Sequence, residues 1–372
     1  MTVLFSALGV VVGSALFVIE KRKLVMHSSI KQLVLVCLIA GFLVAMVIVA
    51  RPKKTFGQAK ERPKPPVSTV TTPETFVDAL NFTFGKQTTH RATHAKGVVL
   101  LGKFTPSAEA ASLSKAPHFK QAVSITARFS DNTGIPKLPD AAPLASPHGL
   151  ALKFHLPDGT ETDLVTHSYN GFPAKNADET RRFFIAVGSS GAGVPSPTPL
   201  DKFMVEHPAA KRFLTAEDPP PVSYGTTTYF GVNSFKFTNA QGKVTFARYQ
   251  LQPEAGRHFL SKEEAARAAP DYLTDELRAR VKQAPVRFNL VAQMAANGDK
   301  IEDPSVAWSD TNKIVSLGTV EIVSVVPDSA ATERGLLFLP AMLPVGIEPA
   351  DPMLSFRSKT YPVSYERRQE QP

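Results

Sequence analysis

The chain has 372 residues, a formal net charge of +9 and one cysteine. This length allows a membrane anchor with one large domain, or two ordinary domains. Positions 1–64 hold ten Lys and Arg residues against two Glu, which accounts for +8 and leaves about +1 for the remainder. Nucleic-acid binding needs basic residues clustered on a folded domain, so we expect no nucleic-acid partner. The single Cys37 excludes a disulfide framework and a cysteine metal cage.

Two apolar runs open the chain, at positions 3–19 and 33–50. A helix that crosses a bilayer needs about 20 apolar residues, with a lower limit of about 17. The second run is the stronger candidate, because it contains no charge and lies between Lys31 and Arg51. The first run could instead be a cleaved signal peptide, and translation from Met26 would leave a single anchor. Basic residues on both sides of the second run leave the orientation open.

The sequence divides into three parts. We expect a membrane anchor of one or two helices at 1–54, a linker rich in Pro and Lys at 55–70 and a folded domain at 71–372. Prolines in the linker favour an extended, semi-rigid spacer. The folded domain begins with a predicted helix, Pro73–Phe84, because Thr72 is a good helix cap and a proline and an acidic residue follow it.

Beyond this helix the pattern changes to strands, with β-branched, aromatic or alternating residues between turn signals. The expected strands are Gly97–Phe104, Ala122–Phe129, Leu150–His155, Thr227–Phe237 and Val244–Leu251. The expected later helices are Pro199–Lys211, Ser261–Ala269 and Asp275–Gln283. This mixture predicts an α+β domain with a sheet or barrel core and helices packed around it.

Common catalytic and cofactor motifs do not account for the chain. The glycine-rich segment Gly188–Gly193 has the wrong order for a dinucleotide fingerprint, and a Walker loop and a nucleophile elbow are missing. His90 and His94 have a spacing seen in helical zinc sites, but the residues that follow indicate a strand. Four residues of a strand span about 13 Å, so we expect no zinc site.

Two distant segments suggest one reactive centre. Arg91–Gly97 contains His94, and an imidazole with a pKa near 6.5 can take up and return a proton. Near the other end Arg357 precedes Tyr361 by four residues, which places both on one helical face. A guanidinium beside a tyrosine favours the phenolate, which binds iron in some haem proteins. Tyr365, one turn further on, is the alternative ligand.

From about Thr72 to Arg368 the chain resembles the monofunctional haem catalase superfamily, and more closely its short, membrane-anchored branch, the catalase-related peroxidases. The matching blocks, in the family's order, are Arg91–Gly97, Ala127–Ser130, His148–Phe154, Tyr229–Phe237, Pro253–Gly256, Asp303–Trp308, Gly346–Pro349 and Arg357–Pro362. One such block is weak, whereas eight in order are specific. The resemblance implies a catalase-type antiparallel β-barrel with surrounding helices, preceded here by the N-terminal transmembrane segment or segments.

The resemblance also implies a haem b cofactor and assigns the residues of the reaction. His94 matches the distal acid-base histidine, and Ser130 matches the serine that orients it. Tyr361 matches the axial iron ligand, with Arg357 beside it, and the proline that follows selects Tyr361 over Tyr365.

Further residues are assigned to the porphyrin by the same resemblance. The two haem propionates need cationic partners, and the matching residues are Arg91, Arg128 and Arg368. Phe172 is the residue expected to stack on the porphyrin ring.

The chain departs from the family at one position. Full-size catalases carry an asparagine after an Asp-Leu-Val strand, and an ungapped alignment puts His167 or Ser168 there. We assign the role to the nearby Asn170, with a vacant role as the alternative. Loss of the asparagine's hydrogen bond should disfavour oxidation of a second hydrogen peroxide, so peroxidase turnover is expected to outweigh catalase turnover.

The sequence therefore predicts a haem peroxidase that reduces hydrogen peroxide or organic hydroperoxides with a small organic electron donor, with weak catalase activity. One alternative is rearrangement of fatty-acid hydroperoxides, as in the allene oxide synthases of this fold. Another is a membrane-tethered haem-binding protein without turnover. We expect the N-terminus to anchor the chain in a bacterial inner membrane with the haem domain in the periplasm. We expect no NADPH site, and a homo-oligomer is left open.

Overall fold

The computed structural model describes residues 65–66, 68–215 and 218–370. The chain divides into two units, Met1–Arg62 and Pro63–Pro372, and every described residue belongs to the second. The predicted anchor at 1–54 and most of the linker at 55–70 thus lie outside the described residues. Within the described part, no helix has the length and apolar character that a membrane crossing requires.

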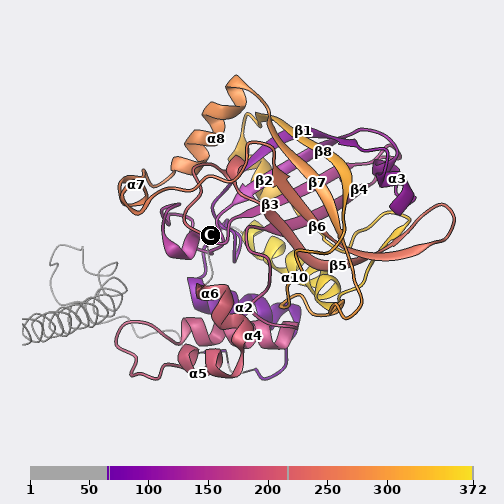
Figure 1. Ribbon diagram of the computed structural model, residues 1–372. Coiled ribbons are helices and arrows are strands. Elements are labelled where there is room, and N and C mark those ends of the chain that lie inside the picture. Colours follow the sequence, from indigo (N-terminus) through magenta and orange to yellow (C-terminus); the bar gives the residue numbers. More distant parts are fainter. Residues whose placement is uncertain (1–64, 67, 216–217, 371–372) are drawn as a thin grey trace, which may run out of the picture. The chain divides into compact units, whose positions relative to one another are not determined.

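Strands β1 to β8 form a closed antiparallel barrel (Figure 1). They are β1 Gly97–Pro106, β2 Val123–Ser130, β3 Gly149–His155, β4 Glu161–His167, β5 Tyr229–Thr238, β6 Val244–Pro253, β7 Val286–Met294 and β8 Ile314–Val325. Their order around the barrel is β4-β3-β2-β1-β8-β7-β6-β5, and His167 of β4 pairs with Phe230 of β5 to close it. A short strand, β9 (Ile347–Pro349), pairs with β5.

Side chains along each strand alternate between the inside and the outside of the barrel. In β2, Ala127 and Phe129 belong to the interior core, where Phe129 stacks on Tyr224 with ring centroids 5.3 Å apart. Arg128 and Ser130 point to the opposite, outer face, yet both are also buried. The outer face of β2 is therefore covered, and polar side chains on it lie in an enclosed space.

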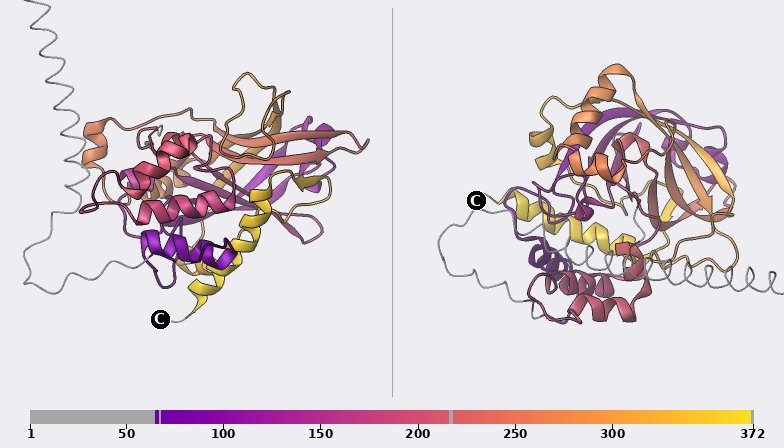
Figure 2. Two further views of the ribbon diagram at one scale, coloured as in Figure 1. Left: turned by 90° about the horizontal axis from the view of Figure 1, so that it is seen from below. Right: turned by 60° about the vertical axis from the view of Figure 1, so that its left-hand side comes forward.

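Helices cover this part of the barrel (Figures 1 and 2). They are α2 Pro73–Phe84, α4 Ala177–Gly188, α5 Pro199–Glu206, α6 Pro208–Thr215 and α10 Pro352–Gln369. Helix α2 packs against both α4 and α10, and α5 packs against α4 and α6. The remaining helices of four or more residues are α3 Ala110–Leu113, α7 Lys262–Arg267, α8 Tyr272–Gln283 and α9 Ser329–Gly335.

Of the predicted helices, the first is confirmed and the second is wrong. Helix α2 has the predicted bounds, and Thr72 caps it in a capping box with Thr75. The predicted single helix Pro199–Lys211 is wrong, because the helix ends at Glu206 and a second one begins at Pro208. Proline lacks the N–H that would continue the helical hydrogen bonds.

Three barrel strands, β4, β7 and β8, are not among the strands expected from alternation alone. In β7, buried and exposed residues alternate from Val286 to Leu290, but Leu290, Val291, Ala292 and Gln293 are then buried one after another, so the alternation is lost in the second half of the strand. A bulge between Leu290 and Val291 shifts the pairing with β8 at the same place.

Lys96, immediately before β1, joins segments that are distant in sequence. Its Nζ donates to the backbone carbonyl of Pro270 at 2.8 Å and pairs with Asp140 and with Asp271, the latter at 2.7 Å. Burial by itself would lower the pKa of Lys96. The hydrogen bonds to Asp140 and Asp271 together have the larger effect and raise this pKa. Asp140 is almost fully buried, so its carboxylate depends on this cation.

We expect Lys96→Met to lower the free energy of unfolding by about 3–5 kcal/mol, because it leaves a buried carboxylate without its partner. Lys103→Met is the matched control, since Lys103 is exposed on β1 and pairs with Glu321 at 3.2 Å. The control should change stability by less than about 1 kcal/mol. Urea denaturation measures both, and equal losses would contradict the role assigned to Lys96.

Candidate active site

A cavity lies between the outer face of β2 to β4 and the helices α2, α4 and α10. It has a volume of about 210 Å³. Its walls are mainly Phe, Leu and Val side chains. Eight of the nine predicted site residues line it, namely Arg91, His94, Arg128, Ser130, Phe172, Arg357, Tyr361 and Arg368. The fold thus brings the two ends of the domain to one enclosed space.

His94 is held in an unusual backbone conformation. Its φ of 54° lies in the left-handed region, which costs a non-glycine residue about 1–3 kcal/mol. The His94 amide donates to the carbonyl of Asn132 at 3.0 Å, and the His94 carbonyl accepts from Arg128 at 2.7 Å. These contacts maintain the strain and fix the direction in which the imidazole leaves the backbone.

Three residues directly opposite one another on neighbouring strands form a row beneath this imidazole. Ser130 of β2 pairs with Gly149 of β3, which pairs with His167 of β4. Opposite residues of antiparallel strands face the same side. A Cβ on Gly149 would lie 3.1 Å from Cε1 and Nδ1 of His94 and 2.6 Å from Oγ of Ser130. The ring of His94 therefore occupies the space that the missing side chain of Gly149 leaves open.

Ser130 and burial together make His94 a neutral base. Nδ1 of His94 lies 3.0 Å from Oγ of Ser130. When Nδ1 carries the proton and donates it to the serine, the Nε2 lone pair is free to accept another proton. Burial first, and then the positive charge of Arg128, lower the pKa of His94 to about 3. The unprotonated ring therefore predominates at physiological pH.

On α10, Tyr361 is part of a chain of hydrogen bonds. Arg357 donates from Nε to the phenol oxygen of Tyr361 at 2.9 Å and from Nη1 to Oδ1 of Asn233 at 2.5 Å. Asn233 in turn donates to Asp351 at 2.6 Å, and Asp351 caps the first turn of α10. The guanidinium and the phenol oxygen are thus held in fixed positions by hydrogen bonds from α10 to the barrel.

Three arginines from separate segments gather at another part of the cavity wall. Arg91, Arg128 and Arg368 all line it, and Glu333 of α9 pairs with Arg91 at 3.8 Å and with Arg128. Three arginines and one glutamate leave an excess of two positive charges. Burial first, and then Arg128 and Arg368, lower the pKa of Arg91. The Nε atoms of Arg91 and Arg128 have no hydrogen-bond partner in the described part of the chain, so anionic groups would satisfy the cluster.

These residues fit a haem group. A flat apolar ring with two carboxylates matches an apolar cavity whose cationic cluster has two unbalanced charges and unpartnered donors. Tyr361 would supply the iron ligand, Arg91, Arg128 and Arg368 would hold the propionates, and His94 would supply the acid-base group. Phe172 lines the same cavity, and its ring centroid lies 6.2 Å from that of His167.

The structure does not support the assignment of Asn170. This residue lies in the bend after β4 and is not among the residues that line the cavity. Ser168 is directed elsewhere, since its hydroxyl accepts from the backbone N–H of His148 at 2.9 Å. His167, the last residue of β4, does line the cavity. Pairing with Gly149 fixes this register, which the ungapped alignment left open.

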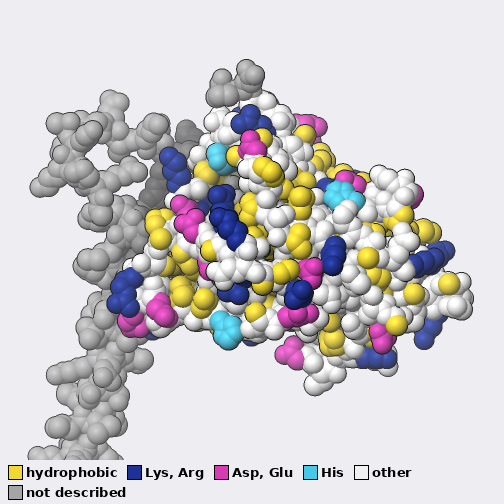
Figure 3. All heavy atoms as spheres, turned by 90° about the horizontal axis from the view of Figure 1, so that it is seen from above, with side chains coloured by type: hydrophobic (Ala, Val, Ile, Leu, Met, Phe, Trp, Pro, Cys, Tyr) yellow, Lys and Arg dark blue, Asp and Glu magenta, His cyan; other side chains and the backbone are white. Residues whose placement is uncertain are grey.

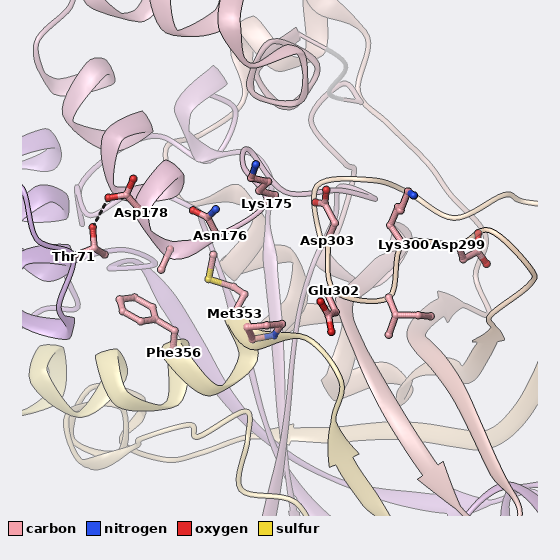
Figure 4. Close-up of a pocket in the computed structure, with 13 residues that line it drawn as sticks. Thr71, Lys175, Asn176, Asp178, Asp299, Lys300, Glu302, Asp303, Met353 and Phe356 are labelled. Atoms are coloured by element: carbon pink, nitrogen blue, oxygen red, sulfur yellow. Dashed lines mark hydrogen bonds between the residues drawn. The ribbon is translucent and has the colours of Figure 1, made fainter.

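A second, more open hollow of about 870 Å³ lies beside the cavity (Figure 4). Lys175, Asp178 and Asp303 are among its charged residues, and Met353 of α10 lines both the hollow and the cavity. The hollow is larger, but it contains neither histidine nor tyrosine. The candidate catalytic residues therefore line the smaller cavity and not the hollow.

On the face shown in Figure 3, basic and acidic side chains lie interspersed among apolar ones.

The fold and the cavity together define a β-barrel protein with a haem-type site. Residues 67–370 match the family model described as Catalase, so the chain belongs to the catalase family. This confirms the predicted superfamily.

Curated relatives of similar size carry a more specific name. The chain is 38% identical over 304 residues to a catalase-related peroxidase of Mycolicibacterium paratuberculosis, which covers 80% of this chain and 95% of that protein. A catalase-related peroxidase of Synechococcus elongatus is 31% identical over 81% of this chain and 90% of that protein. A catalase of Pseudomonas syringae is 29% identical, and the match covers 71% of this chain but 54% of the relative. The chain thus spans about half the length of that catalase.

Solved structures agree on the fold. A fungal catalase superposes with a TM-score of 0.68 at 19% identity, covering 86% of this chain and 66% of that chain. A bacterial catalase gives a TM-score of 0.67 at 19% identity, covering 86% of this chain and 68% of that chain. The predicted catalase-type barrel with surrounding helices is confirmed.

We expect Gly149→Ala to slow the reaction of the haem-loaded protein with peroxide by about a hundredfold, because the new methyl group displaces His94 from its position. Gly335→Ala is the matched control, since a Cβ on Gly335 meets nothing within 4 Å. Stopped-flow absorbance measures both variants. An unchanged rate in Gly149→Ala would contradict the close contact between Gly149 and His94.

The low pKa of His94 also predicts the pH dependence of this reaction. With a pKa of about 3, the neutral base is present throughout the range above it and is lost only as the pH falls through that value. The second-order rate constant with peroxide should therefore stay nearly constant between about pH 5 and 8. A rate that halves near pH 6.5, the usual value for histidine, would show that the imidazole is not shielded as described.

Proposed function

We propose that this chain is a haem b peroxidase that reduces hydrogen peroxide or organic hydroperoxides with electrons from a small organic donor. The proposal rests on one observation. Two hydrogen-bonded pairs, His94 with Ser130 and Arg357 with Tyr361, line the same cavity. Membership of the catalase family and two relatives named catalase-related peroxidase support it. Each turnover consumes one hydroperoxide, two electrons and two protons. The products are one alcohol and one water, or two waters when the substrate is hydrogen peroxide.

The chain's own residues would handle the protons. Bound haem would supply an iron centre that takes up a peroxide oxygen and exchanges electrons. Nε2 of His94 accepts the proton of the bound hydroperoxide and returns it to the departing oxygen, so that water or an alcohol leaves instead of an anion. When Nδ1 of His94 donates to Oγ of Ser130, 3.0 Å away, Nε2 is free for this task.

On the opposite side, the guanidinium of Arg357 keeps a positive charge beside the Tyr361 oxygen. Such a charge-assisted hydrogen bond stabilises the anionic form of the ligand. The apolar walls, which include Phe76 and Phe184, exclude water and strengthen the electrostatic interactions within the cavity.

The proposal is tested with the full chain loaded with haem, a phenolic donor, and hydrogen peroxide or a fatty-acid hydroperoxide. We expect two one-electron donor oxidations per hydroperoxide, and the corresponding alcohol from the fatty-acid substrate. His94→Gln should lower the rate by about 10²–10⁴-fold, since it removes the general base. His90→Gln, an exposed histidine four residues earlier that contacts Thr88, should leave the rate unchanged.

Two outcomes would replace this proposal. Consumption of the lipid hydroperoxide without donor oxidation, with a rearranged product, would favour the allene-oxide type of reaction. Haem binding with no consumption of any peroxide would leave a non-catalytic haem-binding protein.

We also propose that the N-terminal part, 1–54, anchors the chain in a membrane and that the haem domain faces the periplasm. The uncharged run 33–50 between basic residues supports the anchor, and a topology reporter tests which side of the membrane the haem domain faces. The full chain should stay with the membranes during alkaline carbonate extraction, and a chain that begins at residue 69 should be released. Release of both chains, or a cytoplasmic signal from a C-terminal topology reporter, would contradict the proposal.

A further inference from the structure

His167 has one nitrogen engaged and one without a partner. Nδ1 accepts a hydrogen bond from the backbone N–H of Tyr169 at 3.4 Å. Nε2 is shielded from solvent and has no hydrogen-bond partner among the described residues. An unmatched polar atom in such a place is uncommon in folded proteins and calls for a partner.

The engaged nitrogen determines what the other one can do. Because Nδ1 accepts, it carries no proton, so the neutral ring carries its proton on Nε2. Burial, followed by the charge of Arg357, lowers the pKa of His167 to about 3, which keeps the ring neutral at physiological pH. His167 therefore has one N–H to donate and no acceptor left to offer.

The surroundings of His167 hold it next to His94. It ends the row that contains Ser130 and Gly149, over which the ring of His94 lies. His167 is close enough to His94 for protonation of one ring to disfavour protonation of the other, and both residues line one cavity. The rings of Phe172 and Phe213, at 6.2 and 6.4 Å between centroids, pack around His167. The two imidazoles thus occupy fixed, neighbouring positions.

We propose that His167 donates its Nε2–H to an oxygen of the peroxide that His94 deprotonates, and that this acceptor and donor pair selects the reduction of peroxide over its oxidation. The proposal deepens the proposed function and rests on it. A peroxide oxygen seated between the two rings is the partner that the Nε2–H lacks.

The selectivity follows from the protons that each reaction moves. Reduction of a hydroperoxide needs one proton taken from one oxygen and returned to the other, which His94 can do alone, while His167 holds an oxygen lone pair. Oxidation of a second hydrogen peroxide to oxygen takes two electrons and two protons from one molecule. The haem oxidised by the first hydroperoxide would take the electrons, and the protons would end in the water formed from the first hydroperoxide's remaining oxygen. His94 can accept one of these protons, but His167 has no free acceptor for the second O–H. An asparagine side chain has both a donor and an acceptor.

The first test needs no turnover. Nitrogen-15 NMR of the histidines in the haem-free full chain, with His167→Asn to assign the signal, should show a neutral ring protonated on Nε2. Protonation on Nδ1 would overturn the proposal.

The second test uses cyanide, an anion that binds ferric haem and accepts hydrogen bonds. His167→Phe should weaken cyanide binding to the haem-loaded chain about tenfold to a hundredfold, because it removes one donor in a buried site. The control is His155→Asn, since His155 on β3 contacts Thr126 and Glu161 instead of the cavity. Unchanged cyanide affinity in His167→Phe would contradict the proposal.

The third test measures selectivity. His167→Asn provides a hydrogen-bond acceptor, so it should raise the ratio of oxygen released to donor oxidised at least tenfold. This variant also tests the proposal if His167→Phe does not fold. An unchanged ratio, or the same increase in Asn170→Ala, would overturn the assignment to His167. If no variant consumed peroxide at all, the proposed function would fail, whereas the NMR and cyanide results would still decide whether His167 is a donor.

Discussion

The hydrogen bond from Arg357 to Tyr361 is the contact on which the rest of the site depends. A tyrosine that binds iron must have its phenol oxygen in a fixed position, and Arg357 holds that of Tyr361 with a hydrogen bond of 2.9 Å. Asn233 on β5 and Asp351 at the start of α10 hold the guanidinium in place. The same contacts attach α10 to the barrel, so the positions of the helix and of its tyrosine are set together.

The barrel provides the opposite half of the site. Strand pairing places Ser130, Gly149 and His167 in one row, and a rigid sheet holds such a row more accurately than a loop would. Only glycine at the centre of the row leaves room for the strained His94. One wall of the cavity therefore carries His94 and His167, which we propose contact the peroxide, while α10 carries the proposed iron ligand and the arginine cluster has the charge that propionates would need.

How much the sequence could predict depends on how local each feature is. The bounds of α2 follow from the cap at Thr72, and the pairing of Arg357 with Tyr361 follows from the helical repeat. Strand β7 alternates only as far as Leu290, and beyond the bulge residues on both of its faces are buried, so local alternation does not predict the whole strand. The meeting of Arg91, Arg128 and Arg368 is tertiary, so resemblance to a family predicts it and local pattern does not. The sequence favours Asn170, whereas the register of β4, which local pattern does not predict, brings His167 to the cavity wall. Nothing in the neighbouring sequence indicates that Asn233 accepts from Arg357 or that Glu333 pairs with Arg91 and Arg128.

The most direct test of the central claim is the optical spectrum of the full chain titrated with ferric haem, compared with Tyr361→Phe and Tyr365→Phe. Tyr365 is the matched control, because it lies one turn further along α10, with Arg368 over its ring. The account predicts that the wild type and Tyr365→Phe bind one haem with the same tyrosinate-ligated spectrum, and that Tyr361→Phe loses this spectrum. An unchanged spectrum in Tyr361→Phe, or its loss in Tyr365→Phe alone, would contradict the account.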